Sequence, residues 1–444
     1  MAIVFWIHAR NRWPESIQRR LAELNHQGVP TTLAECDQRY RALGSESEAT
    51  HHFQKAFKAI SKQKLPLLPP PQLTNHKWSP RLPRLSEMGS PDQLPRVVSC
   101  LQSNAEALQL LREGMSYSRC LFPIRLIDGY QELLPHLPKC EDAAHLLALD
   151  SVYNIRNGDE AKAANSALAC FHLAEILRDE PNLVAIAVRN RILGIGCIDI
   201  QSCLNLAPFS ISNLITLSAR LRSAMEVNEK ELHRGLATER CLGLSIFQGS
   251  NAEIARFMDE GAEPRLGVIW GVEVLRAEGI LQRDAAYFID FTDQIDSAST
   301  NASRREMVGE LEDIESDVEE NRALATKDTK RCNLVSGLLL PFAIRSVQIH
   351  LWTRTLGEIT LASIAIERYR QEHGQLPTDL RSLVPAYLEK VPEDPYTGGT
   401  ISYRPLPKGY VLFAGRLDAP GSSDGAPASK KDLDSSEIVF RVER

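Results

Sequence analysis

The stretch from residue 141 to residue 204 constrains the fold most, because its apolar residues recur at the three- and four-residue spacing of a buried helix face. This spacing predicts three successive helices. The first is expected to end at Asn157-Gly158-Asp159, where Gly158 can adopt the left-handed conformation that closes a helix and Asp159 can cap the next one. The third, after Pro181, is apolar on almost every side and is expected to be the most buried.

Helical spacing continues through most of the chain before residue 330. Two pairs of residues are spaced as capping boxes, in which a hydroxyl and a glutamate cap the start of a helix: Thr32 with Glu35, and Ser103 with Glu106. No second copy of the first hairpin follows in phase, so a regular repeat array is not expected. The sequence predicts a mainly α protein, an irregular α-solenoid or helical bundle followed by a small α/β module with a short antiparallel sheet.

Changes in composition divide the chain into four parts. Residues 1–60 are expected to form N-terminal helices. Residues 61–96 contain eight prolines, which exclude a regular helix or a central strand and indicate a strap or linker. Residues 97–330 are expected to form the α-helical body, and residues 331–444 a long helix with the α/β module.

The charge and the cysteines of the chain argue against two classes of function. The 444 residues include 51 basic and 57 acidic ones, mixed along the sequence, for a formal net charge of −6. No basic field is present to hold a phosphate backbone, so nucleic acid is not expected as a partner. The nine cysteines are scattered and never paired as C-x-x-C, which disfavours a zinc site and thioredoxin-type chemistry. Most are expected to be small buried hydrophobic residues.

Two apolar runs raise the question of membrane association. Residues 1–7 are apolar but far shorter than the roughly 20 residues that cross a bilayer. We interpret them as part of an ordinary first helix; the alternative is the last part of an anchor that begins upstream, since His8 and Arg10 follow. The run from Leu334 to Ile344 is also too short and contains Pro341, so a buried, kinked helix is expected.

After Gly374 the composition changes to Pro, Gly, Tyr and β-branched residues. Three runs there have strand character: Ile401–Arg404, Tyr410–Phe413 and Ile438–Val442. A long helix precedes Gly374. The carboxyl-terminal part of the chain is therefore expected to pack one long helix against a small antiparallel sheet.

The residues of this module resemble a known family. The similarity lies in the segment from Ile366 to Pro377, in Val391-Pro-Glu-Asp-Pro395 and in Gly409-Tyr-Val-Leu412. Over roughly the last 85 to 100 residues, the size of a small domain, the chain resembles the carboxyl-terminal half of the major pseudopilin of type II secretion systems. No prepilin leader opens the chain and the helix lacks the long apolar stem of pseudopilins. The resemblance therefore implies a head module on a helical body, not a filament subunit.

The whole chain also resembles uncharacterised bacterial proteins in which an α-helical body precedes such a module, often behind an amino-terminal anchor. This resemblance implies no activity. It slightly favours a location in the cell envelope over the cytoplasm.

The resemblance also implies a calcium site. Pseudopilin heads hold calcium in the loop before their last strand, and Asp418 and Asp424 lie near the family positions. Calcium takes about six to eight oxygen ligands, which a loop of Asp, Ser and backbone carbonyls can supply. The Gly, Ser, Ala and Lys of the same loop favour the other interpretation, a solvated loop without a ligand.

No catalytic motif accompanies these features. The 11 histidines form no HExxH pair, and no G-x-S-x-G, Walker A or dinucleotide-binding pattern occurs in a strand-to-helix context. Glu239 and Arg240 lie among leucines and are expected to form a partly buried network with Arg189 or Arg191, which is more often structural than catalytic.

The function that the sequence favours is a non-catalytic helical scaffold that binds a protein partner, associated with the cell envelope and related to secretion machinery. The alternatives are an enzyme whose active site is assembled from residues distant in sequence, and a cytoplasmic helical adaptor. A deep pocket with several charged side chains would favour the enzyme, and a shallow apolar groove would favour the scaffold.

Overall fold

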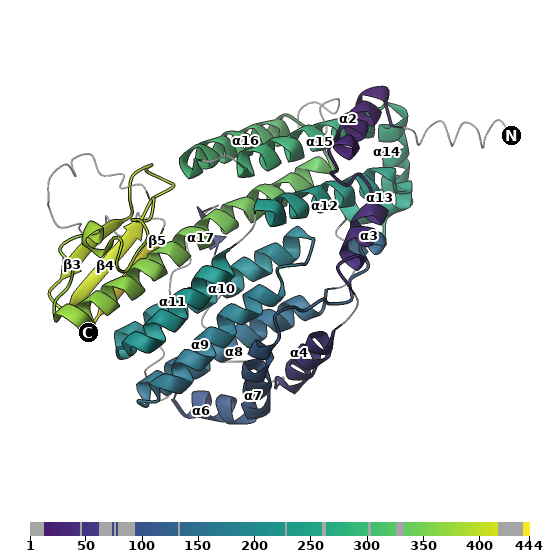
Figure 1. Ribbon diagram of the computed structural model, residues 1–444. Coiled ribbons are helices and arrows are strands. Elements are labelled where there is room, and N and C mark those ends of the chain that lie inside the picture. Colours follow the sequence, from purple (N-terminus) through teal and green to yellow (C-terminus); the bar gives the residue numbers. More distant parts are fainter. Residues whose placement is uncertain are drawn as a thin grey trace.

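The computed structural model describes residues 13–44, 47–61, 73–74, 77–78, 94–131, 134–226, 229–259, 263–300, 303–325, 333–415 and 438–444. In these residues the protein is mainly α-helical, with a small three-stranded antiparallel sheet at its carboxyl-terminal end. Figure 1 shows the helices side by side in an irregular bundle, with the sheet at one end and α14 at the other. The predicted fold class is confirmed.

The first half of the chain supplies nine of the helices that the structure describes. Its helices are α2 (Glu15–His26), α3 (Leu33–Arg41), α4 (Glu48–Ala59), α6 (Leu94–Ser103), α7 (Ala105–Glu113), α8 (His136–Arg156), α9 (Glu160–Ile176), α10 (Leu183–Leu206) and α11 (Ile211–Met225). The predicted turn between α8 and α9 is confirmed, because Gly158 has a φ of 80° and the Asp159 side chain accepts a hydrogen bond from the Lys162 N–H at 3.1 Å. Between α4 and α6 lies the strand pair β1 (Leu73–Thr74) and β2 (Lys77–Trp78); the predicted Pro-rich strap lies mostly outside the described residues.

The second half of the chain adds six helices and the sheet to the described structure. They are α12 (Glu229–Gln248), α13 (Asn251–Met258), α14 (Leu266–Ala277), α15 (Ile280–Ser299), α16 (Arg304–Ala325), α17 (Ser336–His373), β3 (Ser402–Leu406), β4 (Gly409–Ala414) and β5 (Ile438–Glu443). The strands fall where three strand-like runs were predicted. β4 is central and antiparallel to both neighbours, so that Leu412 pairs with Tyr403 on one side and with Phe440 on the other.

The 38-residue helix α17 connects the two large hydrophobic cores of the molecule. It is about 57 Å long at 1.5 Å per residue. Its first part, through Leu351, packs with α12, α15 and α16, whereas the part from Trp352 onward packs with α10, α11 and the sheet. Figure 1 shows it crossing the molecule toward the sheet. The chain therefore builds the body and the module around one shared helix.

The apolar run that begins at Leu334 forms the start of α17. Leu340 and Ile344 are buried there, whereas Leu338 and Phe342 lie on the exposed side. The run is thus amphipathic and continues past Pro341 within the same helix. Across the described ranges, no helix combines the length and the apolar character that a bilayer crossing requires.

The helix caps fall only partly where they were predicted. Thr32 accepts a hydrogen bond from the Glu35 N–H at 3.3 Å, as expected of a cap. Ser103, in contrast, is the last residue of α6, and Asn104 stands between α6 and α7. The Ser103 hydroxyl and the Asn104 amide both donate to the carbonyl of Cys100, at 2.9 and 2.8 Å. Both side chains therefore face the end of α6, and the predicted cap at the start of α7 is wrong.

Candidate functional site

The first candidate site is the outer face of the helix α14. Pro264 precedes this helix, and Gly279, with a left-handed φ of 69°, follows it. Between them the sequence Leu-Gly-Val-Ile-Trp-Gly-Val-Glu-Val-Leu-Arg-Ala is apolar at most positions. Helical spacing places Leu266, Trp270 and Val274, each four residues after the last, on one face. We call these three residues, together with Gly267 and Gly271, the α14 face.

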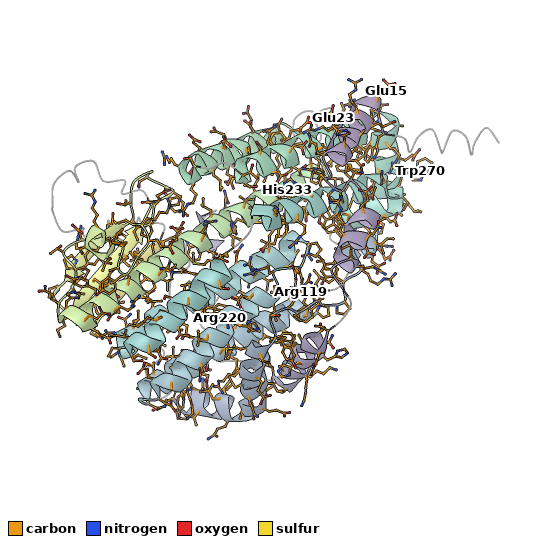
Figure 2. All side chains as sticks on the ribbon, viewed as in Figure 1. Glu15, Glu23, Arg119, Arg220, His233 and Trp270 are labelled. Carbon is orange, nitrogen blue, oxygen red and sulfur yellow. The ribbon has the colours of Figure 1, made fainter. Side chains whose placement is uncertain are left out.

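The α14 face is exposed to solvent. The exposed fractions of Leu266, Trp270 and Val274 are 77%, 70% and 57%, higher than those of the other exposed large apolar residues in the described structure. Of the 12 residues of α14, Val272 alone is buried. Figure 2 shows Trp270 at the outer edge of the molecule. Contiguous exposed apolar residues mark interaction sites in soluble proteins, so this face is a candidate docking surface.

Polar contacts on the other side of α14 hold the helix in place. The Arg276 guanidinium donates to Asn251 Oδ1 at 3.0 Å and to the carbonyl of Gly249 at 2.7 Å, in the turn between α12 and α13. The Asn251 amide also donates to the Glu273 carboxylate. Val272 packs into the core that α12, α15 and α17 share. Because these hydrogen bonds and the packing of Val272 hold the inner side of α14 against the body, the outer face has a fixed orientation.

Gly267 and Gly271 leave two open positions on the same face. Both are exposed, and a Cβ atom built on either would have no neighbouring atom within 4 Å. Neither has a positive φ, so the backbone conformation does not require glycine. A glycine inside a helix costs about 1 kcal/mol relative to alanine. The two glycines therefore lower helix stability without any packing reason inside the described chain.

The second candidate site is a pocket between the α9–α10 connection, α11, α12 and α17. Its volume is about 880 Å³, and five cationic and five acidic side chains line it with one methionine and one leucine. The lining residues are Arg178, Asp179, Arg222, Met225, Glu226, Lys230, Glu231, Arg234, Arg354, Glu358, Leu361 and Glu389. Charge of both signs thus faces the same space.

Ion pairs hold several of the charges that line this pocket. The buried Arg189 guanidinium donates to Glu231 at 2.7 Å, and Arg222 donates to Glu389 at 2.7 Å. Burial raises the pKa of Glu231 and lowers that of Arg189, and the charge of each partner opposes the shift of the other. No Ser, Cys or His is among the described side chains that line the pocket. The pocket can bind a charged molecule, but its lining supplies none of these nucleophiles.

The predicted network of Glu239 and Arg240 with arginines of α10 is wrong. Both residues are buried, as expected, but consecutive residues of a helix point about 100° apart. Glu239 accepts a hydrogen bond from the Tyr130 hydroxyl at 2.6 Å, while Arg240 pairs with Asp293 of α15 at 2.6 Å. Burial raises the pKa of Glu239 to about 7, and the Tyr130 hydrogen bond opposes that shift. These contacts join α12 to two neighbours and are structural.

The cysteines that the structure describes are buried, as predicted, and they are free thiols; Cys332 lies outside those residues. Burial raises the pKa of Cys140, Cys170 and Cys203 well above the ordinary value of a thiol. Because the thiolate is the reactive form, these side chains are expected to be inert. They fill the core.

The predicted calcium ligands Asp418 and Asp424 lie outside the described residues, as does the apolar run of residues 1–7. In the part of the chain that the structure covers, no group of three or more His, Cys, Asp or Glu side chains is placed to hold a metal ion. Asp394 lies close to the point where this loop begins and accepts hydrogen bonds from the N–H of Tyr396 at 2.9 Å and of Gly415 at 3.1 Å. Calcium binding in the loop stays a prediction.

The α14 face was not predicted from the sequence. The spacing of Leu266, Trp270 and Val274 between Pro264 and Gly279 is a clear signal for an apolar helix face. Nothing in that spacing tells whether the rest of the chain covers the face. No protein-family model, no curated protein and no solved structure matches the chain.

Proposed function

We propose that this protein is a non-catalytic helical scaffold that binds a partner through the α14 face. The supporting observation is that Leu266, Trp270 and Val274 are exposed on a helix whose opposite side is fastened to the body. Burying a side chain of this kind contributes about 1.5 to 3 kcal/mol, and tryptophan is enriched among the residues that carry binding energy. A partner that covers this face therefore gains from all three side chains at once.

This proposal is tested by site-specific photo-crosslinking in the cells that produce the protein. A photoreactive phenylalanine analogue replaces Trp270, and in the matched control it replaces Ile215, which is 46% exposed on α11. Both positions point to solvent, so the fold is expected to be unchanged. We expect a discrete adduct from position 270 and none from position 215. A folded protein without any adduct at position 270 would contradict the proposal.

The carboxyl-terminal module leads us to propose a place in the cell envelope, beside secretion machinery. This proposal rests on the resemblance of its residues to the major pseudopilin. In the structure α17 packs against β4 and β5, and the Ser363 and Tyr410 hydroxyls share a hydrogen bond of 2.7 Å there. Fractionation and affinity purification of the natural protein test this location. Recovery with envelope or secretion components is expected, whereas recovery from the cytoplasm alone would favour the cytoplasmic adaptor.

Calcium binding by the loop of Asp418 and Asp424 belongs to the same proposal. A ligand that binds only the folded state raises the melting temperature by mass action. We expect Ca²⁺ to raise the Tm of the full chain, and a D418N/D424N double variant to lose that response. Mg²⁺ serves as the control, since it prefers a smaller octahedral site. An unchanged Tm with Ca²⁺ would leave the loop as a solvated segment.

An enzyme is the second candidate function, because the charged pocket has the character expected of an active site assembled from distant residues. Two substitutions at exposed positions separate the candidates in a strain whose own gene is deleted. If the pocket carries the function, Lys230→Ala abolishes complementation and Trp270→Ser preserves it. The scaffold proposal expects the reverse. Lys230 lies in the pocket lining and is exposed, so its loss is expected to leave the fold intact.

A further inference from the structure

We propose that the α14 face binds the same face of a second copy of this chain, so that the protein forms a two-fold symmetric dimer. This inference rests on the proposed function of the α14 face as a docking surface, and it names the occupant. Three observations support the dimer: the shape of the α14 face, the open space at its two glycines, and the charges at the two ends of the helix.

The face carries a projection and a recess side by side. Trp270 is 70% exposed, and the neighbouring Gly267 and Gly271 leave the helix backbone uncovered, with open space where side chains would lie. In a two-fold interface each patch meets itself, so the projection of one copy faces the recess of the other. Small residues also let two helices approach closely. Two α14 helices that cross with each Trp270 over the glycines of the other copy satisfy these conditions.

Internal packing explains several helical glycines of the described chain, but not Gly267 and Gly271, nor Gly309 of α16 and Gly337 of α17. A Cβ atom on Gly196, Gly243 or Gly357 would lie 2.5, 2.3 or 2.4 Å from a neighbouring side chain, so the core requires glycine there. Gly267 and Gly271 face open space. On α14 this open space lies beside the exposed Trp270, so the described part of the chain leaves room there for a closely packed second helix.

The charges around the face favour a copy of this chain over a lipid surface. Arg265 is exposed at the start of α14 and Glu278 is exposed at its end. When two such helices cross in antiparallel orientation, Arg265 lies near Glu278 of the partner subunit, and the same pair forms twice. Helices that lie on membranes carry a polar face rich in Lys and Arg. The charged residues at the two ends of α14 are of opposite sign, which favours contact with a protein surface over contact with a lipid surface.

The size of the face sets the expected affinity. The 12 residues of α14 span about 18 Å, and stable interfaces bury about 800 Å² on each partner. A contact centred on one such helix lies at the small end of that range. The dimer is therefore expected to dissociate at concentrations on the order of micromolar.

Sedimentation velocity of the full chain over a range of concentrations tests the inference. We expect a monomer–dimer equilibrium that Trp270→Ser weakens about thirtyfold or more, since a central aromatic residue carries much of the energy of an interface. Gly271→Leu fills the recess and is expected to weaken the dimer as strongly. Because leucine forms helices better than glycine, this variant keeps the monomer folded. The matched control is Gly309→Leu on α16, another helical glycine in open space, which should leave the dissociation constant unchanged.

A monomer at every concentration, or a dimer that survives both Trp270→Ser and Gly271→Leu, would overturn the second copy as the occupant. The photo-crosslink at position 270 then separates this failure from that of the proposed function. An adduct with a different protein in cells would keep the α14 face as a docking surface while overturning the dimer. No adduct with any protein would overturn both. A monomer that binds phosphatidylcholine vesicles only while Trp270 is present would assign the face to lipid and also overturn the dimer.

Discussion

Two apolar helices of this protein, α10 and α14, differ in how far the rest of the described chain buries them. In α10, 17 of the 24 residues are buried, whereas in α14 only one of the 12 is buried. Gly196 of α10 stands where the Phe171 ring fills the space, and Gly271 of α14 faces open solvent. Apolar composition therefore indicates that a helix will be covered, without indicating what covers it. For α10 the cover is the chain itself, and for α14 we have proposed a second copy.

The largest expected difference between the two helices is in the response to truncation. Ile192 of α10 is fully buried, and Ile192→Ala is expected to lower the free energy of unfolding by about 2 to 5 kcal/mol through lost burial and the cavity left behind. Val274 of α14 is 57% exposed, and Val274→Ala is expected to change it by less than about 0.5 kcal/mol. Urea denaturation of the dilute monomer measures both. Similar losses from the two variants would show that the chain itself covers the α14 face.

The sequence predicted those elements whose cause is local. Gly158 and Asp159 fix the turn between α8 and α9 by their own backbone and side-chain chemistry, so the hairpin was readable from the residues. The run Ile438–Val442 was likewise readable as a strand from its alternation. The partners of Glu239 and Arg240 were not, because Tyr130 and Asp293 lie far away in the sequence.

The exposure of the α14 face, like the partners of Glu239 and Arg240, depends on parts of the chain that are distant in sequence. The helix itself is local and follows from its residues, but its exposure is set by where α12, α13 and α15 end and by what they leave uncovered. No periodicity in one sequence encodes that. The calcium prediction at Asp418 and Asp424 came from a resemblance alone, and the described residues do not reach it.

A smaller expected effect, on the pH dependence of stability, separates the buried interior of the protein from the α14 face. Glu239 is buried and its pKa is raised from 4.5 to about 7. The folded state thus holds this proton more tightly than the unfolded chain. The contribution of Glu239 to stability is therefore fully present below about pH 4.5 and is lost as the pH rises through about 7. Since a tenfold change in proton affinity is worth about 1.4 kcal/mol, the loss is on the order of 3 kcal/mol.

Glu239→Gln is expected to remove this part of the pH dependence, because the amide still accepts the Tyr130 hydrogen bond and does not titrate. Unfolding free energies of the two proteins at about pH 5 and about pH 8 measure it. Glu239 is buried on α12, away from the residues of the α14 face, so Glu239→Gln is expected to leave the dimer constant unchanged at both pH values. An unchanged slope in the Gln variant would remove Glu239 as its cause.

The smallest expected effect, and the one that divides the two helices most directly, is a reversal of sign between two glycine-to-alanine substitutions. In Gly196→Ala the new methyl group would lie 2.5 Å from the Phe171 ring. The resulting overpacking exceeds the gain in helix propensity and leaves a net loss of roughly 1 kcal/mol. In Gly271→Ala the methyl group enters open space, so a gain of up to about 1 kcal/mol is expected.

Thermal unfolding of the two variants measures this reversal, with Gly309→Ala on α16 as the control for an open helical glycine. Gly271→Ala is expected to raise the Tm as Gly309→Ala does, yet to weaken the dimer, which Gly309→Ala leaves unchanged. A higher Tm together with a weaker dimer is expected only if Gly271 contributes to association and not to folding. The same substitution then stabilises the helix and disturbs the packing between the two copies. A lower Tm for Gly271→Ala would mean that something within the chain already covers the α14 face, and the contrast with α10 would disappear.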